Sequence, residues 1–293
     1  MLLPVKALGQ TPEASPENTE NSISVQDARG QWVTLERPAQ RVVALAPHIV
    51  ENVYAAGGGD KLVAAVSHSD YPAEASELLQ VGSYKVVNYE QILALKPDLV
   101  ISWASGNGEA VAAQLERLGV TVYVDELRSL QDIAREVRVL GELLGTREQA
   151  NKTVDQWQER LAQLEQNYRA TEPVSVLYQV WNDPLQTLNG EHLVSDVIRL
   201  CGGRNAFADA VSIAPKINIE SVIARDPQAI VASGMGEERP EWLDEWRFYP
   251  TLQSVQNKHL FFVPPDIIQR HTLRILDGAE LMCRHLQTVR QPG

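Results

Sequence analysis

Between positions 147 and 170, the apolar residues recur at the spacing of an α-helix. Six of them are three or four positions apart: Ala150, Val154, Trp157, Leu161, Leu164 and Tyr168. This spacing gathers them on one side of a helix and leaves charged and amide side chains on the other. Thr146 is placed to cap the start, and Pro173 stops the helix soon after its end. We expect an unbroken rod about 36 Å long, either a surface helix of one domain or a rigid joint between two lobes.

On the N-terminal side of this helix, short apolar runs alternate with segments of helical pattern. Residues 24–35 are typical of a β-hairpin. Predicted strands cover 41–47, 62–67, the end of 93–103 and 121–126, and predicted helices cover 49–56, 108–118 and 129–143. Continuous apolar runs are typical of strands buried on both faces of a parallel sheet. Their alternation with helices therefore predicts an α/β lobe.

The same alternation begins again on the C-terminal side. Strands are predicted at 174–180, the end of 219–233 and 260–265, and helices at 191–200, the start of 219–233 and 272–289. Residues 88–102 also align with residues 218–232 at a constant offset of 130, with Asn, Glu, Ala and Pro identical. A helix–Pro–strand passage is common, but its placement on both sides of the long helix favours duplication.

These patterns predict an α/β fold class: two Rossmann-like lobes with central parallel sheets, joined by one long α-helix. The expected boundaries are a leader over 1–23, an N-terminal lobe over 24–145, an interlobe helix over 146–171 and a C-terminal lobe over 172–293. The leader contains a small-x-small cleavage pattern at Val5-Lys6-Ala7 and then a run rich in Pro, Ser, Glu and Asn. We interpret it as the remnant of an export signal followed by a disordered segment.

Charge and cysteine content narrow the class of partner. The net charge of −12 argues against nucleic acid, which calls for a basic patch. Cys201 and Cys283 follow no zinc-binding spacing, and could be free thiols of a cytosolic protein or one disulfide of an exported one. The chain contains no GxSxG, GxGxxG, Walker A or HExxH motif. We therefore expect neither an enzyme nor a resident cofactor or metal.

In a two-lobed α/β protein, the expected site is the cleft at the carboxyl ends of the strands. The loops there carry aromatic and polar residues: His48, His68, Tyr84, Trp103, Trp181, Asp266 and Arg270. Such a set suits a large, flat, mostly apolar ligand that is hydrogen-bonded at its rim. Each residue also has a structural interpretation, because the tryptophans could be core residues and Asp266–Arg270 an exposed helical ion pair.

Glu90 and Glu220 occupy equivalent positions in the two copies of the repeat. Both are expected at the start of a helix, where the helix dipole favours a carboxylate by roughly 0.3–1 kcal/mol. Local stability is therefore a sufficient explanation. The functional alternative is a pair of acidic contacts, related by pseudo-twofold symmetry, that dock on a twofold partner.

Several motifs together resemble a known family. RVVALAPHIVE, SHSDYP, NYEQILALKPDLVISWASGN, the turn at 201–203 and DIIQR occur in the order found in the solute-binding proteins of ABC importers whose lobes are joined by a single helix. That class takes up cobalamin, haem and ferric siderophores. The resemblance covers residues 24–290 and is nearest to the cobalamin branch. It implies a monomeric, periplasmic, non-catalytic protein that delivers cobalamin or another corrinoid to a dimeric permease in the inner membrane, with haem or a ferric siderophore as the alternative ligand.

The resemblance also implies roles for individual residues. Cys201 and Cys283 are at the places of the family's disulfide, and Glu90 and Glu220 match the glutamates that dock on permease arginines. Four positions match residues that line the corrinoid cleft: Pro47, Trp103, Asp266 and Arg270. The chain departs from the pattern in two places: His68 stands where the family often has an aromatic residue, and the SIAPK stretch around Ala214 lacks an expected tryptophan. Trp181, in a neighbouring loop, is the candidate replacement.

Overall fold

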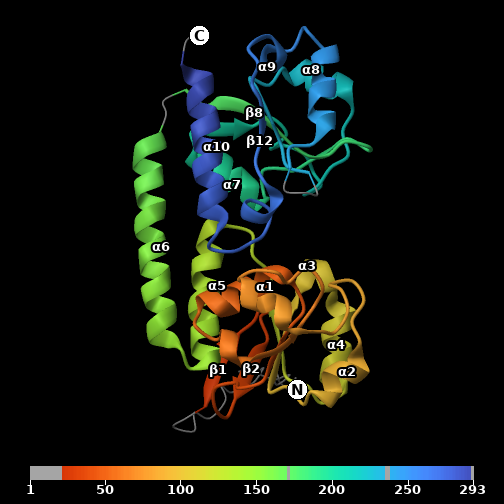
Figure 1. Ribbon diagram of the computed structural model, residues 1–293, viewed down its shortest axis with the longest axis vertical. Helices are drawn as coiled ribbons and strands as arrows, with labels where there is room; N and C mark the ends of the chain where they lie inside the picture. Colours follow the sequence, from red (N-terminus) through yellow and green to blue (C-terminus); the bar gives the residue numbers. More distant parts are fainter. Residues whose placement is uncertain (1–21, 170–171, 235–237, 292–293) are drawn as a thin grey trace, which may run out of the picture.

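The computed structural model describes residues 22–169, 172–234 and 238–291. Two lobes lie one above the other, and the long helix α6 (Arg147–Tyr168) runs beside both (Figure 1). Each lobe is built on its own sheet of mostly parallel strands. The fold class expected from the sequence, two parallel-sheet lobes joined by one long helix, is confirmed. Residues 1–21, the greater part of the predicted leader, lie outside the described residues.

The N-terminal lobe contains a five-stranded parallel sheet in the order β5–β4–β3–β6–β7. Its strands are β3 (Val42–Ala44), β4 (Leu62–Ala65), β5 (Leu79–Gln80), β6 (Leu99–Trp103) and β7 (Val122–Asp125). The predicted hairpin is present as β1 (Ile23–Gln26) and β2 (Trp32–Leu35). The helices are α1 (Pro47–Ala55), α2 (Tyr89–Ala94), α3 (Ala104–Asn107), α4 (Glu109–Arg117) and α5 (Leu130–Leu144), with 3₁₀ turns η1 (Gly59–Lys61) and η2 (Ala73–Glu77).

Successive residues of the central strand β3 face two different helical layers. Val42 and Ala44 are buried in the core that includes α1 and α5, whereas Val43 is buried in the core that includes α2 and α4. Burial on both faces explains the continuous apolar run, because no position of the strand meets water. The carboxyl ends of β3, β6 and β7 consequently lie side by side at one edge of the lobe.

The C-terminal lobe repeats the plan with the strand order β10–β8–β11–β12. Its strands are β8 (Val174–Trp181), β9 (Gln186–Thr187), β10 (Gly203–Asn205), β11 (Ala229–Ala232) and β12 (Leu260–Phe262), with β9 antiparallel to β8. Its helices are α7 (Leu193–Leu200), α8 (Ile219–Arg225), α9 (Gln253–Gln256) and α10 (Ile275–Arg290), with 3₁₀ segments η3 (Glu241–Phe248) and η4 (Pro265–Ile267). A disulfide joins Cys201, at the end of α7, to Cys283 in α10.

The apolar stripe of α6 is confirmed. Ala150, Val154, Trp157 and Leu164 are buried, and the helix packs along α5 and α10 (Figure 1). The Trp157 indole N–H donates to the Leu273 carbonyl at 2.8 Å, which ties the middle of the helix to the C-terminal lobe. Thr146 occupies the N-cap position, but its side chain makes no capping hydrogen bond, so that expectation was wrong in detail. No helix in the described part of the chain is long and apolar enough to span a bilayer.

The sequence repeat corresponds to a repeated structure. Residues 88–102 form α2 and β6, and residues 218–232 form α8 and β11. Both helices begin with an asparagine cap: Asn88 Oδ1 accepts from the Gln91 backbone N–H at 3.1 Å, and Asn218 Oδ1 accepts from the Ser221 backbone N–H at 2.9 Å. In each copy the glutamate two residues after the cap is exposed.

Candidate functional site

The N-terminal lobe places His48 at the edge of the sheet where the strands end. β3 leads directly into α1, so His48 stands in the first turn of that helix. Asp125 is the last residue of β7, two strands away in the same sheet. His48 Nε2 lies 3.0 Å from Asp125 Oδ2, and both side chains are buried. The carboxylate therefore fixes the orientation of the imidazole.

Five rings form a cluster that joins the two lobes, called here the ring cluster: Tyr84, Trp103, His48, His271 and His192. The His48 and Trp103 rings meet edge to face with centroids 5.1 Å apart, and Tyr84 is 6.0 Å from Trp103. From the C-terminal lobe, His271 lies 5.9 Å from His48 and 6.5 Å from Trp103. His192 is 5.6 Å from His271.

Three members of the ring cluster were expected from the sequence, and two were missed. His48, Tyr84 and Trp103 are brought together as predicted, whereas His192 and His271 were not considered. His271 directly follows the DIIQR motif, so the continuation of that loop was the available signal. His192 is the N-cap of α7, with Nδ1 accepting from Val194 N–H. Its position gave no sign that it faces the other lobe.

The histidines on the C-terminal side of the ring cluster are neutral at pH 7. Burial, and then the charges of His48 and His192, hold the pKa of His271 well below its usual range. Burial lowers the pKa of His192 to about 4. A conjugated, largely apolar ligand would therefore meet uncharged rings here.

Asn107 holds the aromatic residues of the N-terminal lobe in place. Its carboxamide oxygen accepts from Trp103 N–H at 2.6 Å, and its amide donates to the carbonyl oxygens of Tyr84 at 2.6 Å and Leu45 at 2.9 Å. Gly106 lies against the Trp103 ring, and an added Cβ would overlap that ring. The GN of the SWASGN motif thus positions two aromatic residues.

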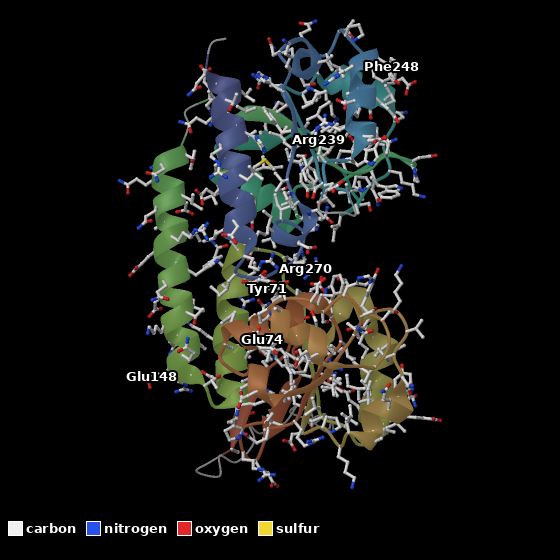
Figure 2. All side chains as sticks on the ribbon, viewed as in Figure 1. Tyr71, Glu74, Glu148, Arg239, Phe248 and Arg270 are labelled. Carbon is white, nitrogen blue, oxygen red and sulfur yellow. A yellow bond between two sulfur atoms is a disulfide. The ribbon has the colours of Figure 1, made fainter. Side chains whose placement is uncertain are left out.

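Arg270 forms a second connection between the lobes. Its Nη1 lies 2.9 Å from Glu51 Oε1 and 2.7 Å from Asp70 Oδ1, both in the N-terminal lobe. Its Nη2 lies 3.3 Å from Asp266 Oδ1. Burial by itself lowers the pKa of Arg270, but the hydrogen bonds to Asp70 and Glu51 outweigh it and raise that pKa above the ordinary value. Figure 2 shows Arg270 and Tyr71 where the lobes approach each other.

The remaining expected ligand residues lie outside the ring cluster. Pro47 begins α1 and is half-buried, next to His48. His68 is exposed in the loop after β4 with a φ of 66°, in the left-handed region. Trp181 ends β8 with 38% of its surface exposed, and its indole N–H donates to the Asp183 carbonyl at 2.8 Å. Their contact with a ligand stays a prediction.

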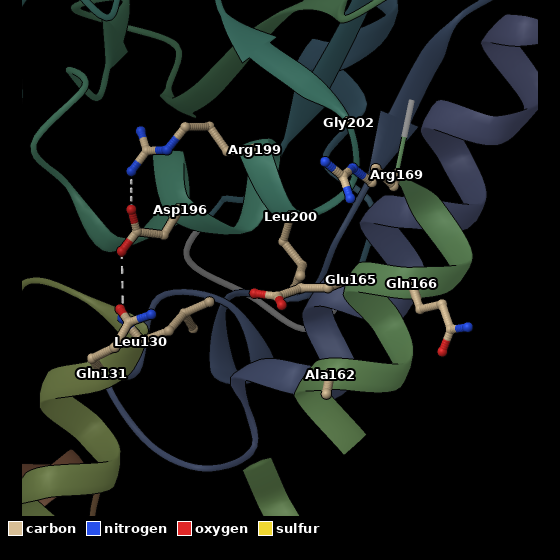
Figure 3. Close-up of a pocket in the computed structure, with 10 residues that line it drawn as sticks. All are labelled: Leu130, Gln131, Ala162, Glu165, Gln166, Arg169, Asp196, Arg199, Leu200 and Gly202. Atoms are coloured by element: carbon tan, nitrogen blue, oxygen red, sulfur yellow. Dashed lines mark hydrogen bonds and ion pairs between the residues drawn. The ribbon is translucent and has the colours of Figure 1, made fainter. Parts of the chain in front are cut away.

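A groove of about 650 Å³ lies beside the connecting helix instead of at the ring cluster (Figure 3). It is lined by the start of α5, the second half of α6 and the end of α7. Within this groove, Asp196 of α7 pairs with Arg199 and accepts from the Leu130 backbone N–H at 3.4 Å, which links α7 to the start of α5. Within the described residues, no three His, Cys, Asp or Glu side chains are grouped so that they could hold a metal ion.

Comparison with known proteins assigns the chain to a family. Residues 42–267 match the periplasmic binding protein family. The chain belongs to that family. A vitamin B12-binding protein of Vibrio cholerae serotype O1 is 38% identical over 250 residues, which cover 85% of this chain and 90% of that protein. One from Photorhabdus laumondii is 35% identical over 246 residues, covering 84% and 87%. The family expected from the motifs is therefore confirmed.

Solved structures show that this periplasmic binding protein shares its fold with binders of different solutes. The periplasmic vitamin B12-binding protein BtuF of Vibrio cholerae superposes with a TM-score of 0.80 at 37% identity, covering 87% of this chain and 99% of that one. The periplasmic heme-binding protein RhuT from Roseiflexus sp. RS-1 superposes with a TM-score of 0.75 at 24% identity. The second likeness establishes the fold alone.

Proposed function

We propose that this periplasmic binding protein captures cobalamin or a related corrinoid between its lobes and delivers it to a dimeric ABC permease in the inner membrane. The observation that carries the proposal is the 38% identity, over 85% of the chain, to proteins named for vitamin B12 binding. The proposal further includes a periplasmic location, a monomeric state and no catalysis of its own.

The geometry of the junction supports this ligand class. Trp103 and Tyr84 offer aromatic faces held by Asn107, and the neutral histidines beside them add no charge. A corrin ring is flat and mostly apolar, so it would be buried against these faces, while its peripheral amides need polar partners. Asp266 and Arg270 are the partners proposed for those amides, and Pro47, His68 and Trp181 are proposed to complete the walls.

Haem is a second candidate, favoured by a specific observation. His271 is uncharged at neutral pH because burial lowers its pKa. An uncharged imidazole keeps one ring nitrogen free of a proton, and that nitrogen is the one that binds iron. His48, His68 and Tyr84 are the axial ligands that the sequence suggested, and His271 now joins them as a candidate.

Calorimetry with cyanocobalamin and with haemin distinguishes the two ligands. We expect one cyanocobalamin per chain. Trp103→Ala should weaken its affinity about tenfold or more, because truncating a central aromatic anchor commonly costs over 1.4 kcal/mol. Trp32→Ala is the matched control, since Trp32 lies 60% exposed on the hairpin strand β2. Heat from haemin alone, with a Soret band that shifts in His271→Ala, would overturn the corrinoid assignment.

A further inference from the structure

A buried carboxylate of the N-terminal lobe meets two arginines of the C-terminal lobe. Glu51 lies in α1, and its side chain is only 3% exposed. Its Oε1 accepts from Arg270 Nη1 at 2.9 Å and lies 3.4 Å from Arg274 Nη1. Neither arginine belongs to the N-terminal lobe, so each ion pair crosses between the lobes. Burial reduces screening by water, and these contacts are therefore stronger than surface ion pairs.

Further contacts surround this carboxylate on both sides of the junction. The Asn52 amide, next along α1, donates to the His271 carbonyl oxygen at 3.0 Å. The Arg274 guanidinium lies over the Tyr71 ring, 3.8 Å from its centroid. Asp70 binds the same Arg270 Nη1 as Glu51. The segment 266–274 of the C-terminal lobe is therefore fixed to α1 and to the loop after β4.

This segment also carries the ring that completes the cluster. His271 directly follows Arg270, which is held by Glu51 and Asp70. The carbonyl oxygen of His271 accepts from the Asn52 amide. The ring of His271 lies against His48 and Trp103 of the other lobe. If the ion pairs were lost, the hydrogen bond from Asn52 would be left to hold this part of the segment against α1, and His271 would be less firmly placed.

We propose that Glu51 is a positioning residue that, through Arg270 and Arg274, holds the two lobes at a fixed separation and places His271 in the ring cluster. Within this arrangement α6 connects the lobes at their side, and Glu51 connects them at the junction itself. The placement of the lobes does not depend on the identity of the ligand. The effect of Glu51 on the affinity for the ligand rests on the proposed function.

Spin labels across the junction test the positioning role without any ligand. Both natural cysteines are in the disulfide, so cysteines introduced at exposed Ala110 and Phe248 would be labelled selectively. α4, which carries residue 110, and Phe248 lie in different lobes on the side away from α6 (Figures 1 and 2). In Glu51→Gln we expect the distance distribution to broaden and shift to longer distances.

Two further variants keep the test decisive. Asp209→Asn is the matched control, because Asp209 pairs with Arg225 inside the C-terminal lobe and should leave the distances unchanged. Asp70→Asn removes a half-exposed partner of Arg270, so its fold is not at risk, and it should shift the distribution in the same direction by less. Unchanged distributions in both Glu51→Gln and Asp70→Asn would overturn the proposal.

Ligand affinity provides the second readout. Cyanocobalamin binding should weaken about tenfold in Glu51→Gln, because one partner of a buried charge pair is removed, and should be unaffected in Asp209→Asn. If the unmodified protein binds no corrinoid, the proposed function fails while the distance measurement still decides the role of Glu51. Broadened distances with unchanged affinity would overturn the placement of His271 and retain the connection between the lobes.

Discussion

Behind the ring cluster, His48 is backed by buried acids. Asp125 accepts from His48 on one side, and Glu136 of α5 accepts from the Tyr123 hydroxyl at 2.7 Å on the other. Burial, and then the charge of Asp125, raise the pKa of Glu136 to about 8. At neutral pH Glu136 is therefore mainly protonated, because burial disfavours its charged form and the nearby Asp125 carboxylate adds to that effect.

This raised pKa predicts a stability that falls as the pH rises. A carboxyl group whose pKa is raised from 4.5 to about 8 on folding stabilises the protein fully below pH 4.5. That contribution is lost as the pH rises to 8, because the unfolded chain ionises freely while the folded one does not. In Glu136→Gln we expect the loss between pH 5 and pH 8 to shrink by on the order of 3 kcal/mol. Thermal unfolding measured at both pH values would show it.

Tyr123→Phe is the control for this prediction. It removes the hydrogen bond to Glu136 and leaves the titrating carboxyl group in place. That hydrogen bond favours the charged carboxylate, so its loss raises the pKa of Glu136 further. The melting temperature of Tyr123→Phe should therefore still fall as the pH rises, with the fall extending to higher pH. Parallel pH profiles for Glu136→Gln and the unmodified protein would contradict the assignment.

Individual site residues could be predicted only where they lie at the end of a strand that the sequence pattern identifies. Trp103 follows an apolar run directly, and His48 follows the Pro that ends another, so both were placed at the correct sheet edge. Asp125 ends an equally apolar strand and could have been found in the same way. Glu51 could not, because its importance comes from a contact with a residue more than 200 positions away, which no local pattern records.

At the level of elements, periodicity decided what could be predicted. α6 was predicted because its stripe extends over six turns, and β8 because its run is long. β5 and β9 contain two residues each, and so few positions carry no period. β10 begins at Gly203, and glycine is unfavourable in strands. β10 pairs with β8 because the preceding helix α7 ends beside that strand.

The disulfide constrains two helices of the C-terminal lobe. It joins Cys201 to Cys283 across a sequence separation of 82 residues, and both side chains are fully buried. The entropy of closing such a loop corresponds to about 4–5 kcal/mol, and removing a native disulfide commonly costs about 2–5 kcal/mol. We expect Cys201→Ala with Cys283→Ala to lower the free energy of unfolding by about 2–5 kcal/mol.

Urea denaturation, with and without reductant, measures this effect. Full reduction should bring the unmodified protein to the midpoint of the double variant, whose own midpoint should not respond to reductant. A double variant as stable as the oxidised protein would contradict the prediction.

In the whole molecule, duplication places two equivalent helix starts on different lobes. Glu90 and Glu220 stand at the second positions of α2 and α8, both exposed. A partner with twofold symmetry could contact both at once. The repeat was visible in the sequence because caps and buried strands are local. The distance between the lobes was not visible in the sequence, because it depends on the contacts of Arg270 and Arg274.

This arrangement predicts a transport defect without a binding defect. If Glu90 and Glu220 dock on the proposed permease, Glu90→Ala with Glu220→Ala should abolish uptake by cells that carry that permease, because two charged contacts would be lost. Affinity for the ligand should not change, since neither glutamate belongs to the ring cluster. Uptake assays and calorimetry on the same variant measure the two effects.

Glu148→Ala is the matched control, because Glu148 is also an exposed glutamate at the second position of a helix, α6, but lies on the joint (Figure 2). It should leave uptake intact. Normal uptake by the double variant would exclude docking through these residues and leave the helix dipole as their explanation.

The position of the disulfide along the chain also sets an order of maturation. Every strand of the N-terminal sheet is complete at Asp125, whereas the bond in the other lobe must wait for Cys283. Because domains tend to fold as units in the order in which they emerge, the first lobe can reach its final form under reducing or oxidising conditions alike. Only the second lobe needs an oxidant to reach its full stability.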